Sequence, residues 1–348
     1  LPLVIGLVLH SDACKKGLLS DSSIGNVLVS MYGKCGNSLE AENVFCNLSQ
    51  RDSTSWNAML ATYIEQGEGG KALRLYRQML EDHVNQERHT VVLILQACDM
   101  IEDERNSHCI CIRSLIQSVM NIRKALHDYA RRKGLASDTF VATSLINMYS
   151  KCGMIDEARN MFQTLSRRDV VSWTAMLDAY VEQSEGEKVL QLYQQMQEDG
   201  IRPDQHAFVV SLQACSLLAE KVAQEIDEYK SMKAKALEIG KALHVDIKRM
   251  GYAANVYANN ALLVMYGKCG DLPQAEYLFN TLPRPDIVAW TVMLSAYAKQ
   301  GEAERVLLLY KRFRNEQVLL DDCTLICVLQ SCSGIGDIEM CNHLYFDI

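Results

Sequence analysis

The sequence lacks the segments that mark membrane and secreted proteins. Its 348 residues include only five prolines and no apolar run close to the roughly 20 residues that a membrane helix requires. The opening letters, LPLVIGLVLH, have neither the basic flank nor the cleavage site of a secretory signal. The chain starts at Leu1 rather than Met, which indicates a fragment or a processed form. With 49% apolar residues, it is predicted to fold as a soluble protein with a large core.

A net positive charge and catalytic motifs are also missing. The formal net charge is -8, which disfavours binding to nucleic acid through phosphate contacts alone. No histidine begins an H-x-E triplet and no C-x-x-C pair exists, so the zinc site of a nucleotide deaminase is absent from this chain. Phosphate-cradling glycine loops and the G-x-S-x-G elbow are absent too. We therefore predict no catalytic residue, no metal site and no cofactor.

The 13 cysteines do not form a disulfide or zinc pattern. Six of them recur at a spacing of 117 residues, in two series: Cys35, Cys152 and Cys269, and Cys98, Cys215 and Cys332. Cysteines that recur in this way are predicted to be small buried packing residues in a reducing compartment.

The same spacing of 117 residues governs the whole chain. The letters MYGKCG stand at 31–36, return as MYSKCG at 148–153 and appear again as MYGKCG at 265–270. The three tryptophans, Trp56, Trp173 and Trp290, keep this step, and so do IGLVLH, IRKALH and IGKALH. Self-similarity at a fixed period is typical of repeat proteins.

Each period divides into units of 31, 35 and 51 residues. We predict a partial long repeat at 1–21, a first triplet at 22–138, a second at 139–255, and a third at 256–348 that is truncated in its long repeat. Apolar residues within a unit follow helical spacing, as in Leu28, Met31 and Tyr32. Every unit is therefore predicted to be a helical hairpin whose first helix ends at MYGKCG or its equivalent. Hairpins that cannot bury an apolar stripe alone stack on their neighbours.

The long units carry extra residues within 99–122 and 216–239. The second insert is rich in strong helix formers and has no proline or glycine before Gly240, so an extended or additional helix is expected there. The two inserts share length but little sequence, which favours a spacer over a binding site.

Three stretches resemble known motifs: NVLVSMYGKCGNSLEAENVF, WTAMLDAYVEQSEGEKVLQLYQQMQEDGIRPD, and FVVSLQACS followed by IGKALHVDIKRMGY. They are similar to the short, standard and long motifs of pentatricopeptide repeat proteins of the mixed-length (PLS) subclass of land plants. The resemblance covers the chain except for its two inserts. It implies an all-α, right-handed superhelical solenoid of helix-turn-helix repeats, similar to tetratricopeptide proteins, that binds single-stranded RNA.

The resemblance implies that the fifth and last residues of each unit face one base. In order, these pairs are Asn26 with Asp52, Asn57 with Glu87, Val92 with Asp138, Thr143 with Asp169, Thr174 with Asp204, Val209 with Asn255, Asn260 with Asp286, and Thr291 with Asp321; Ile326 has no partner. An ionised Asp accepts hydrogen bonds only, and among the bases only guanine and uracil present an imino N–H on the pairing edge. Family behaviour associates Thr with purine and Asn with pyrimidine. The expected RNA is 5'-U, pyrimidine, any, G, G, any, U, G-3'.

The same residues have a structural alternative. Asp, Asn and Thr at the start of a helix are common capping residues. Lys34, Lys151, Lys268 and Lys299 match positions where the family contacts phosphate, but they could be solvated surface residues. Phe140, Val171, Tyr257 and Val288, at the second position of their units, would stack between bases, or they could be buried against a neighbouring hairpin.

The resemblance implies the recognition portion of an RNA editing or processing factor in a mitochondrion or chloroplast. Its partners would be an organelle transcript and other editing-complex proteins. Family members that edit RNA carry a C-terminal deaminase-like (DYW) domain, and whether one follows in the full-length protein stays open. Two alternatives stay open: a tetratricopeptide-like scaffold whose groove holds a peptide, and a non-functional fragment. A peptide groove would not preserve the pairing of Asn or Thr with Asp.

Overall fold

Every element of the described structure is helical. The computed structural model describes residues 2–17, 22–103, 112–220, 226–282, 285–315, 325, 326, 328, 329 and 331. Within these residues the elements are α1 (Pro2–Lys15), α2 (Ser22–Lys34), α3 (Ser38–Asn47), α4 (Ser53–Glu65), α5 (Gly69–Glu81), α6 (Arg88–Asp103), α7 (Ile112–Arg132), η3 (Leu135–Ser137), α8 (Thr139–Lys151), α9 (Ile155–Thr164), α10 (Val170–Glu182), α11 (Gly186–Glu198), α12 (Gln205–Glu220), α13 (Ile226–Arg249), η4 (Tyr252–Ala254), α14 (Val256–Cys269), α15 (Leu272–Thr281), α16 (Ile287–Lys299) and α17 (Ala303–Asn315). The predicted all-α fold of helical hairpins is confirmed.

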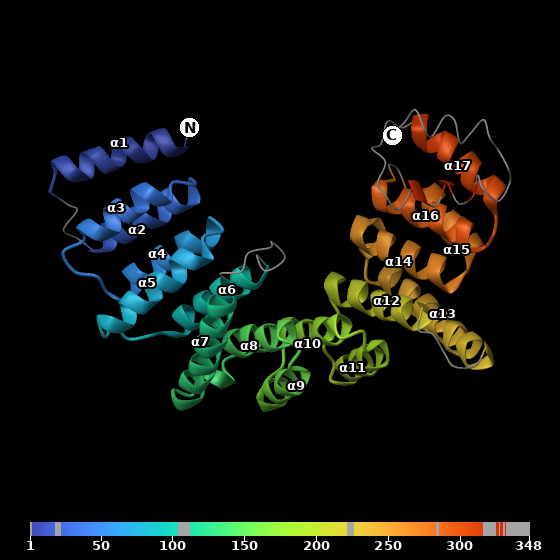
Figure 1. Cartoon of the computed structure of the whole chain (residues 1–348), viewed down its shortest axis with the longest axis horizontal. Coiled ribbons are helices and arrows are strands. Elements are labelled where there is room, and N and C mark those ends of the chain that lie inside the picture. Colours follow the sequence, from blue (N-terminus) through green and yellow to red (C-terminus); the bar gives the residue numbers. More distant parts are fainter. Residues whose placement is uncertain are drawn as a thin grey trace. The chain divides into compact units, whose positions relative to one another are not determined.

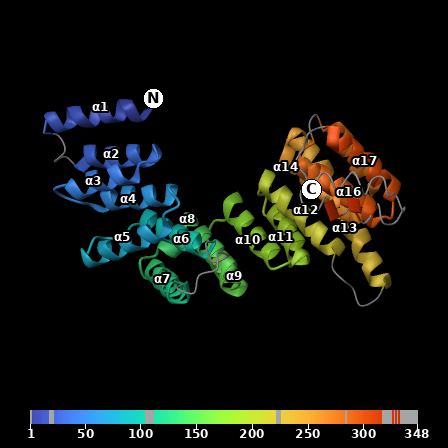
Figure 2. The ribbon, with the colours of Figure 1, turned by 45° about the horizontal axis from the view of Figure 1, so that its top comes forward.

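The chain divides into two compact units, Leu1–Ala179 and Tyr180–Ile348. In the first, α2 packs on α3, α4 on α5, and α6 on α7, and the first helices also contact one another from α2 through α4 and α6 to α8. In the second, α12, α14 and α16 form the same kind of row, each with its own hairpin partner. Figures 1 and 2 show the successive hairpins of the first unit side by side.

The first helix of a hairpin begins at every predicted unit start inside the described residues. These starts are Ser22, Ser53, Arg88, Thr139, Val170, Gln205, Val256 and Ile287. The even-numbered helices are therefore the first helices of the units, and their N-terminal ends carry the fifth and last residues to which the sequence assigns base contacts.

The repeated letters MYGKCG end the first helix, as predicted. Their closing glycines, Gly36, Gly153 and Gly270, have φ of 77°, 71° and 78°, a left-handed conformation that other residues adopt at a cost. One residue later, the backbone N–H donates back to the carbonyl of the motif tyrosine, at 3.0 Å for Tyr32, 2.9 Å for Tyr149 and 3.0 Å for Tyr266. This hydrogen bond closes the helix and turns the chain into the second helix.

The recurrent histidines pack against the motif tyrosines. The Nδ1 atoms of His10 and His244 lie 2.7 and 2.9 Å from the hydroxyls of Tyr32 and Tyr266, and His127 makes the same contact with Tyr149. Burial lowers the pKa of His244 to about 4, so this ring is neutral at physiological pH. These contacts give the recurrent histidines a packing role.

The tryptophans form the core between short and standard units. Trp56, Trp173 and Trp290 are at most 1% exposed. Each meets the phenylalanine of the preceding unit edge to face, with centroids 5.1 Å apart for Phe45, 4.9 Å for Phe162 and 4.9 Å for Phe279. Such pairs stabilise by roughly 0.5–1.5 kcal/mol beyond their burial. Cys98, Cys215 and Cys269 are buried as predicted, Cys35 and Cys152 are half-buried, and Cys332 lies outside the described residues.

Both inserts lengthen the helices of the long hairpins. The helices α6, α7, α12 and α13 have 16, 21, 16 and 24 residues, against 10 to 14 in the short and standard units. The expectation of helix in the second insert is confirmed in the described part of 216–239, and the described part of 99–122 is helical as well. Among the described residues, no helix combines the length and apolarity that a bilayer crossing needs.

Candidate nucleic-acid interface

The last residue of most units caps the first helix of the next unit. Its Oδ1 atom accepts a backbone N–H in six cases: Asp52 from Ser55 (2.8 Å), Asp138 from Phe140 (3.1 Å), Asp169 from Ser172 (2.9 Å), Asp204 from Ala207 (2.8 Å), Asn255 from Ala258 (3.0 Å) and Asp286 from Ala289 (2.9 Å). These six residues therefore do cap helices, as the structural alternative predicted. Capping uses one oxygen and leaves the second polar atom of the side chain for another partner.

In the first and third short units the side chain of the fifth residue reaches the side chain of the last residue. Asn260 Nδ2 donates to Asp286 Oδ2 at 2.7 Å. Hydrogen bonds from Ser55 and from the Asn26 side chain hold the pKa of Asp52 below its ordinary value, against the effect of partial burial. In both pairs the asparagine Oδ1 atom is buried and has no hydrogen-bond partner among the described residues. An orphaned buried acceptor is costly, by about 1–3 kcal/mol, and an N–H donor from a ligand would satisfy it.

The unit 53–87 is arranged differently. Asn57 is 6% exposed, and its Oδ1 accepts from the hydroxyl of Thr90 at 2.7 Å. Glu87 accepts from the hydroxyl of Ser53 at 2.6 Å. Each of the two predicted reading residues thus has a polar partner of its own, and neither of these contacts joins Asn57 to Glu87. The different arrangement accompanies a different residue, because this unit ends in Glu87 where most of the other units end in Asp.

The threonines at the fifth position lie close to the protein interior. Thr143 is 9% exposed, and its buried hydroxyl has no hydrogen-bond partner within the part of the chain that the structure describes. Thr174 is 6% exposed and donates to the carbonyl of Val170 at 3.0 Å. Thr291 makes the same bond to Ile287 at 2.8 Å. Its predicted partner Asp321 lies outside the described residues.

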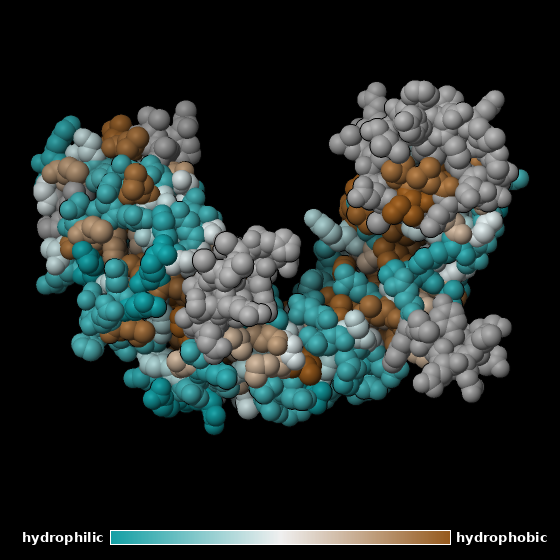
Figure 3. Space-filling view, viewed as in Figure 1, coloured by the Kyte–Doolittle hydropathy of each residue, from teal (hydrophilic) through white to brown (hydrophobic). Residues whose placement is uncertain are grey.

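The second positions are exposed. Phe140, Val171, Tyr257 and Val288 are 70%, 55%, 72% and 46% exposed, so the alternative that they are buried against a neighbouring hairpin is wrong. Large apolar side chains are expensive to leave in water without a partner. On the face shown in Figure 3, hydrophilic residues predominate and hydrophobic ones are interspersed.

Three of the four predicted phosphate lysines are in ion pairs. Lys151 Nζ lies 3.9 Å from Asp99 Oδ2, while Lys268 and Lys299 lie 2.8 and 3.4 Å from the two carboxylate oxygens of Glu220. Lys34 is exposed. Although partial burial raises it, the pKa of Glu220 is lowered overall by the two lysines, so this acid is ionised at neutral pH. Sequence reasoning missed Glu220 because it lies in an insert, where the two long units share little sequence.

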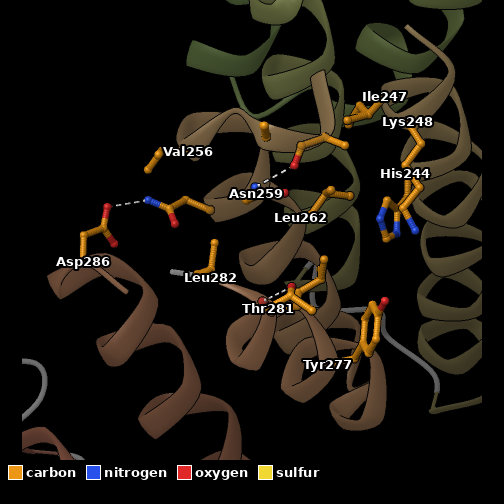
Figure 4. Close-up of a pocket in the computed structure, with 14 residues that line it drawn as sticks. His244, Ile247, Lys248, Val256, Asn259, Leu262, Tyr277, Thr281, Leu282 and Asp286 are labelled. Carbon is orange, nitrogen blue, oxygen red and sulfur yellow. Dashed lines mark hydrogen bonds between the residues drawn. The ribbon is translucent and has the colours of Figure 1, made fainter. Parts of the chain in front are cut away.

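A cavity of about 410 Å³ lies beside the Asn260–Asp286 pair. His244 on α13, Tyr277 on α15 and both members of the pair line it. Figure 4 shows Asp286 at one end of this cavity and His244 with Tyr277 at the other. Within the described residues, no group of three or more His, Cys, Asp or Glu side chains is arranged to hold a metal ion.

Tandem helical hairpins of this kind, with polar pairs recurring at the helix starts, define a helical-repeat protein. The PPR repeat model matches residues 26–52, 54–84, 140–170 and 288–318, and the PPR repeat family model matches residues 168–216. The chain belongs to this family, that of the pentatricopeptide repeat.

Similar proteins are long plant members of the family. Pentatricopeptide repeat-containing protein At2g33680 of Arabidopsis thaliana is 31% identical over 99% of this chain and 43% of its own length. The chloroplastic At4g18520 and the mitochondrial At3g02330, from the same plant, are 28% and 29% identical over 97% and 96% of the chain and 49% and 36% of their own lengths. The chain therefore spans less than half of each of these relatives.

Among solved structures, the chain is similar to PPR10 in complex with an 18-nucleotide psaJ RNA element. The match covers 94% of this chain and 53% of the PPR10 chain, with 16% sequence identity and a TM-score of 0.46.

Proposed function

We propose that this chain is a sequence-specific RNA-binding array of the mixed-length subclass that reads single-stranded RNA, one base per repeat. The observation that carries the proposal is the asparagine–aspartate pair, which recurs two periods apart in the first and third short units. In both copies an ionisable acceptor and an orphaned amide oxygen stand together at the start of a first helix. Two acceptors call for a donor, and the imino N–H of uracil or guanine is one.

The exposed second positions supply the other half of a base site. Phe140 and Tyr257 follow directly on the helix starts of short units, and base stacking on an aromatic side chain contributes roughly 1–3 kcal/mol per base. A base held between such plates meets the polar pair with its edge. The expected ligand is 5'-U, pyrimidine, any, G, G, any, U, G-3', with the RNA parallel to the protein.

The biological setting follows from the relatives. Some of them are named as chloroplastic or mitochondrial, and we extend an organelle location and a role in RNA editing or processing to the protein that contains this chain. Other editing-complex proteins, and a DYW domain supplied by the rest of the full-length protein, belong to the same proposal. This chain itself supplies recognition and no catalysis.

The test is equilibrium binding to the expected RNA and to a copy whose two adjacent guanines are changed to cytosines. We expect a loss of affinity of at least about tenfold, since two base contacts worth about 1–3 kcal/mol each are removed. Equal binding to both RNAs would contradict base reading. Failure to bind any RNA would leave the peptide scaffold as the better explanation.

A further inference from the structure

The two complete long units hold their last residue in a way that differs from the short units. In each, the first residue of the unit reaches the last: Arg88 Nη1 donates to Asp138 Oδ2 at 3.0 Å, and Asn255 Nδ2 donates to Gln205 Oε1 at 2.8 Å. The fifth residues, Val92 and Val209, have no polar group to offer. In the long units, the last residue is thus hydrogen-bonded to residue 1, whereas in the third short unit Asp286 is hydrogen-bonded to residue 5, Asn260.

Arg88 also lies over a proposed base-stacking side chain. Its guanidinium lies 5.5 Å from the ring centroid of Phe140, which is the second residue of the next unit and is 70% exposed. More than half of the Arg88 side chain, 56%, is exposed. The contact with Asp138 uses one of the five N–H donors of the guanidinium, and this exposure lets a ligand reach the others.

We infer that Arg88 is a specificity-determining residue, and that it makes guanine the preferred third base where the fifth residue alone would leave that position open. The inference rests on the proposed function. A base that stacks on Phe140 replaces the guanidinium over the ring. The guanidinium, still tethered to Asp138, then meets the edge of that base.

Guanine fits this arrangement because its O6 and N7 atoms accept two parallel N–H donors from one arginine. Adenine presents an amino donor beside N7, and the pyrimidines lack the pair of adjacent acceptors. A phosphate is a poorer partner here, because the carboxylate of Asp138 already neutralises the arginine and repels a second anion. The second long unit has the neutral Gln205 at the same place, so the sixth base stays open.

The experiment measures binding to four RNAs that carry the expected site and differ only at the third base. The wild-type chain should bind the guanine RNA at least about fivefold more tightly than the other three, the lower end for a bidentate contact. Arg88→Gln, which installs the residue of the second long unit, should bind all four alike. Arg131→Gln removes another exposed positive charge from the same unit, at the end of α7, and should keep the preference.

Several results would overturn the inference. One is a wild-type chain that is indifferent to the third base but still loses affinity when the fourth and fifth guanines are changed; the proposed function would then survive. Another is an equal weakening of all four RNAs by Arg88→Gln with the guanine preference retained, which would indicate a phosphate contact. A chain that is indifferent at every position contradicts the proposed function itself.

A transfer to the second long unit gives an independent result. Gln205→Arg combined with Asn255→Asp rebuilds the same pair next to Tyr257, which is 72% exposed. This double variant should acquire a preference for guanine at the sixth base. If it binds the four sixth-base RNAs as evenly as the wild-type chain does, residue 1 does not select the base.

Discussion

At the scale of single residues, the acid that ends a unit combines two physical roles. Asp286 caps the next first helix with Oδ1 and accepts from Asn260, at position 5, with Oδ2, and Asp138 likewise caps with Oδ1 and accepts from Arg88, at position 1, with Oδ2. Capping fixes the carboxylate in one orientation, so its second oxygen is preorganised. The capping alternative therefore supports the proposal of base reading more than it competes with it.

Glu220 offers the clearest electrostatic prediction. It pairs with Lys268 and Lys299 and lies where phosphates are proposed to run, so Glu220→Gln should free two cations and strengthen RNA binding by several-fold at low salt. The slope of log affinity against log salt should steepen by about 0.7 for each additional phosphate that a freed lysine neutralises. Filter binding over a salt series measures both quantities.

A control for this change is Glu81→Gln, which removes an exposed acid from the end of α5, a second helix. It alters the net charge of the chain equally and should have a much smaller effect. Equal effects of the two variants would show that only the overall charge matters and that Lys268 and Lys299 are not at the interface.

Thr174 tests the fifth-position rule directly. Thr174→Asn should move the preference at the fifth base from guanine toward uracil, because an asparagine amide can pair with a terminal aspartate as Asn260 does with Asp286. Affinities for RNAs with G or U at that base give the result. Thr164→Asn on α9, an exposed position on a second helix, is the matched control. An unchanged preference would refute the assignment for this unit.

At the scale of elements, most of the helices could be predicted because the period of 117 residues aligns their signals. Helix starts coincide with unit starts, and the MYGKCG letters end helices where the left-handed glycine requires it. The side-chain partners of Asp138 and Lys268 could not be predicted in this way. Arg88 has Gln205 one period away, so repetition carries no signal for it, and Glu220, although an acid one period after Asp103, lies where the two inserts share little sequence.

The close approach of α2 and α4 gives a stability prediction. A Cβ on Gly33 would lie 2.4 Å from Oγ1 and 3.1 Å from Cβ of Thr62. Gly33→Ala should therefore destabilise the chain, by roughly 1–3 kcal/mol from overpacking, even though alanine favours the helix by about 1 kcal/mol. Thermal unfolding measures the change.

The second period suggests the compensating change, since it has Ser150 and Ala179 at the places of Gly33 and Thr62. In a Thr62→Ala background the clash is absent, so Gly33→Ala should become neutral or stabilising. The same loss of stability in both backgrounds would show that crowding between the two helices is not the cause.

At the scale of the whole molecule, the acidic balance is compatible with RNA binding only if base contacts carry much of the affinity. Net charge is -8, and three of the four predicted phosphate lysines are partly neutralised by Asp99 or Glu220. Affinity for RNA without the expected bases should accordingly be low. The acidic net charge can be calculated from the sequence. The ion pairs of Asp99 and Glu220 could not be predicted, because each joins side chains of helices that are distant in the sequence.

The most direct measurement is an affinity profile in which each of the eight bases of the expected RNA is replaced in turn by the other three. We predict preferences for U at the first and seventh bases, for G at the third, fourth, fifth and eighth, a weaker pyrimidine preference at the second, and indifference at the sixth. A flat profile, or preferences that do not follow the order of the units along the chain, would contradict the claim that each repeat reads one base.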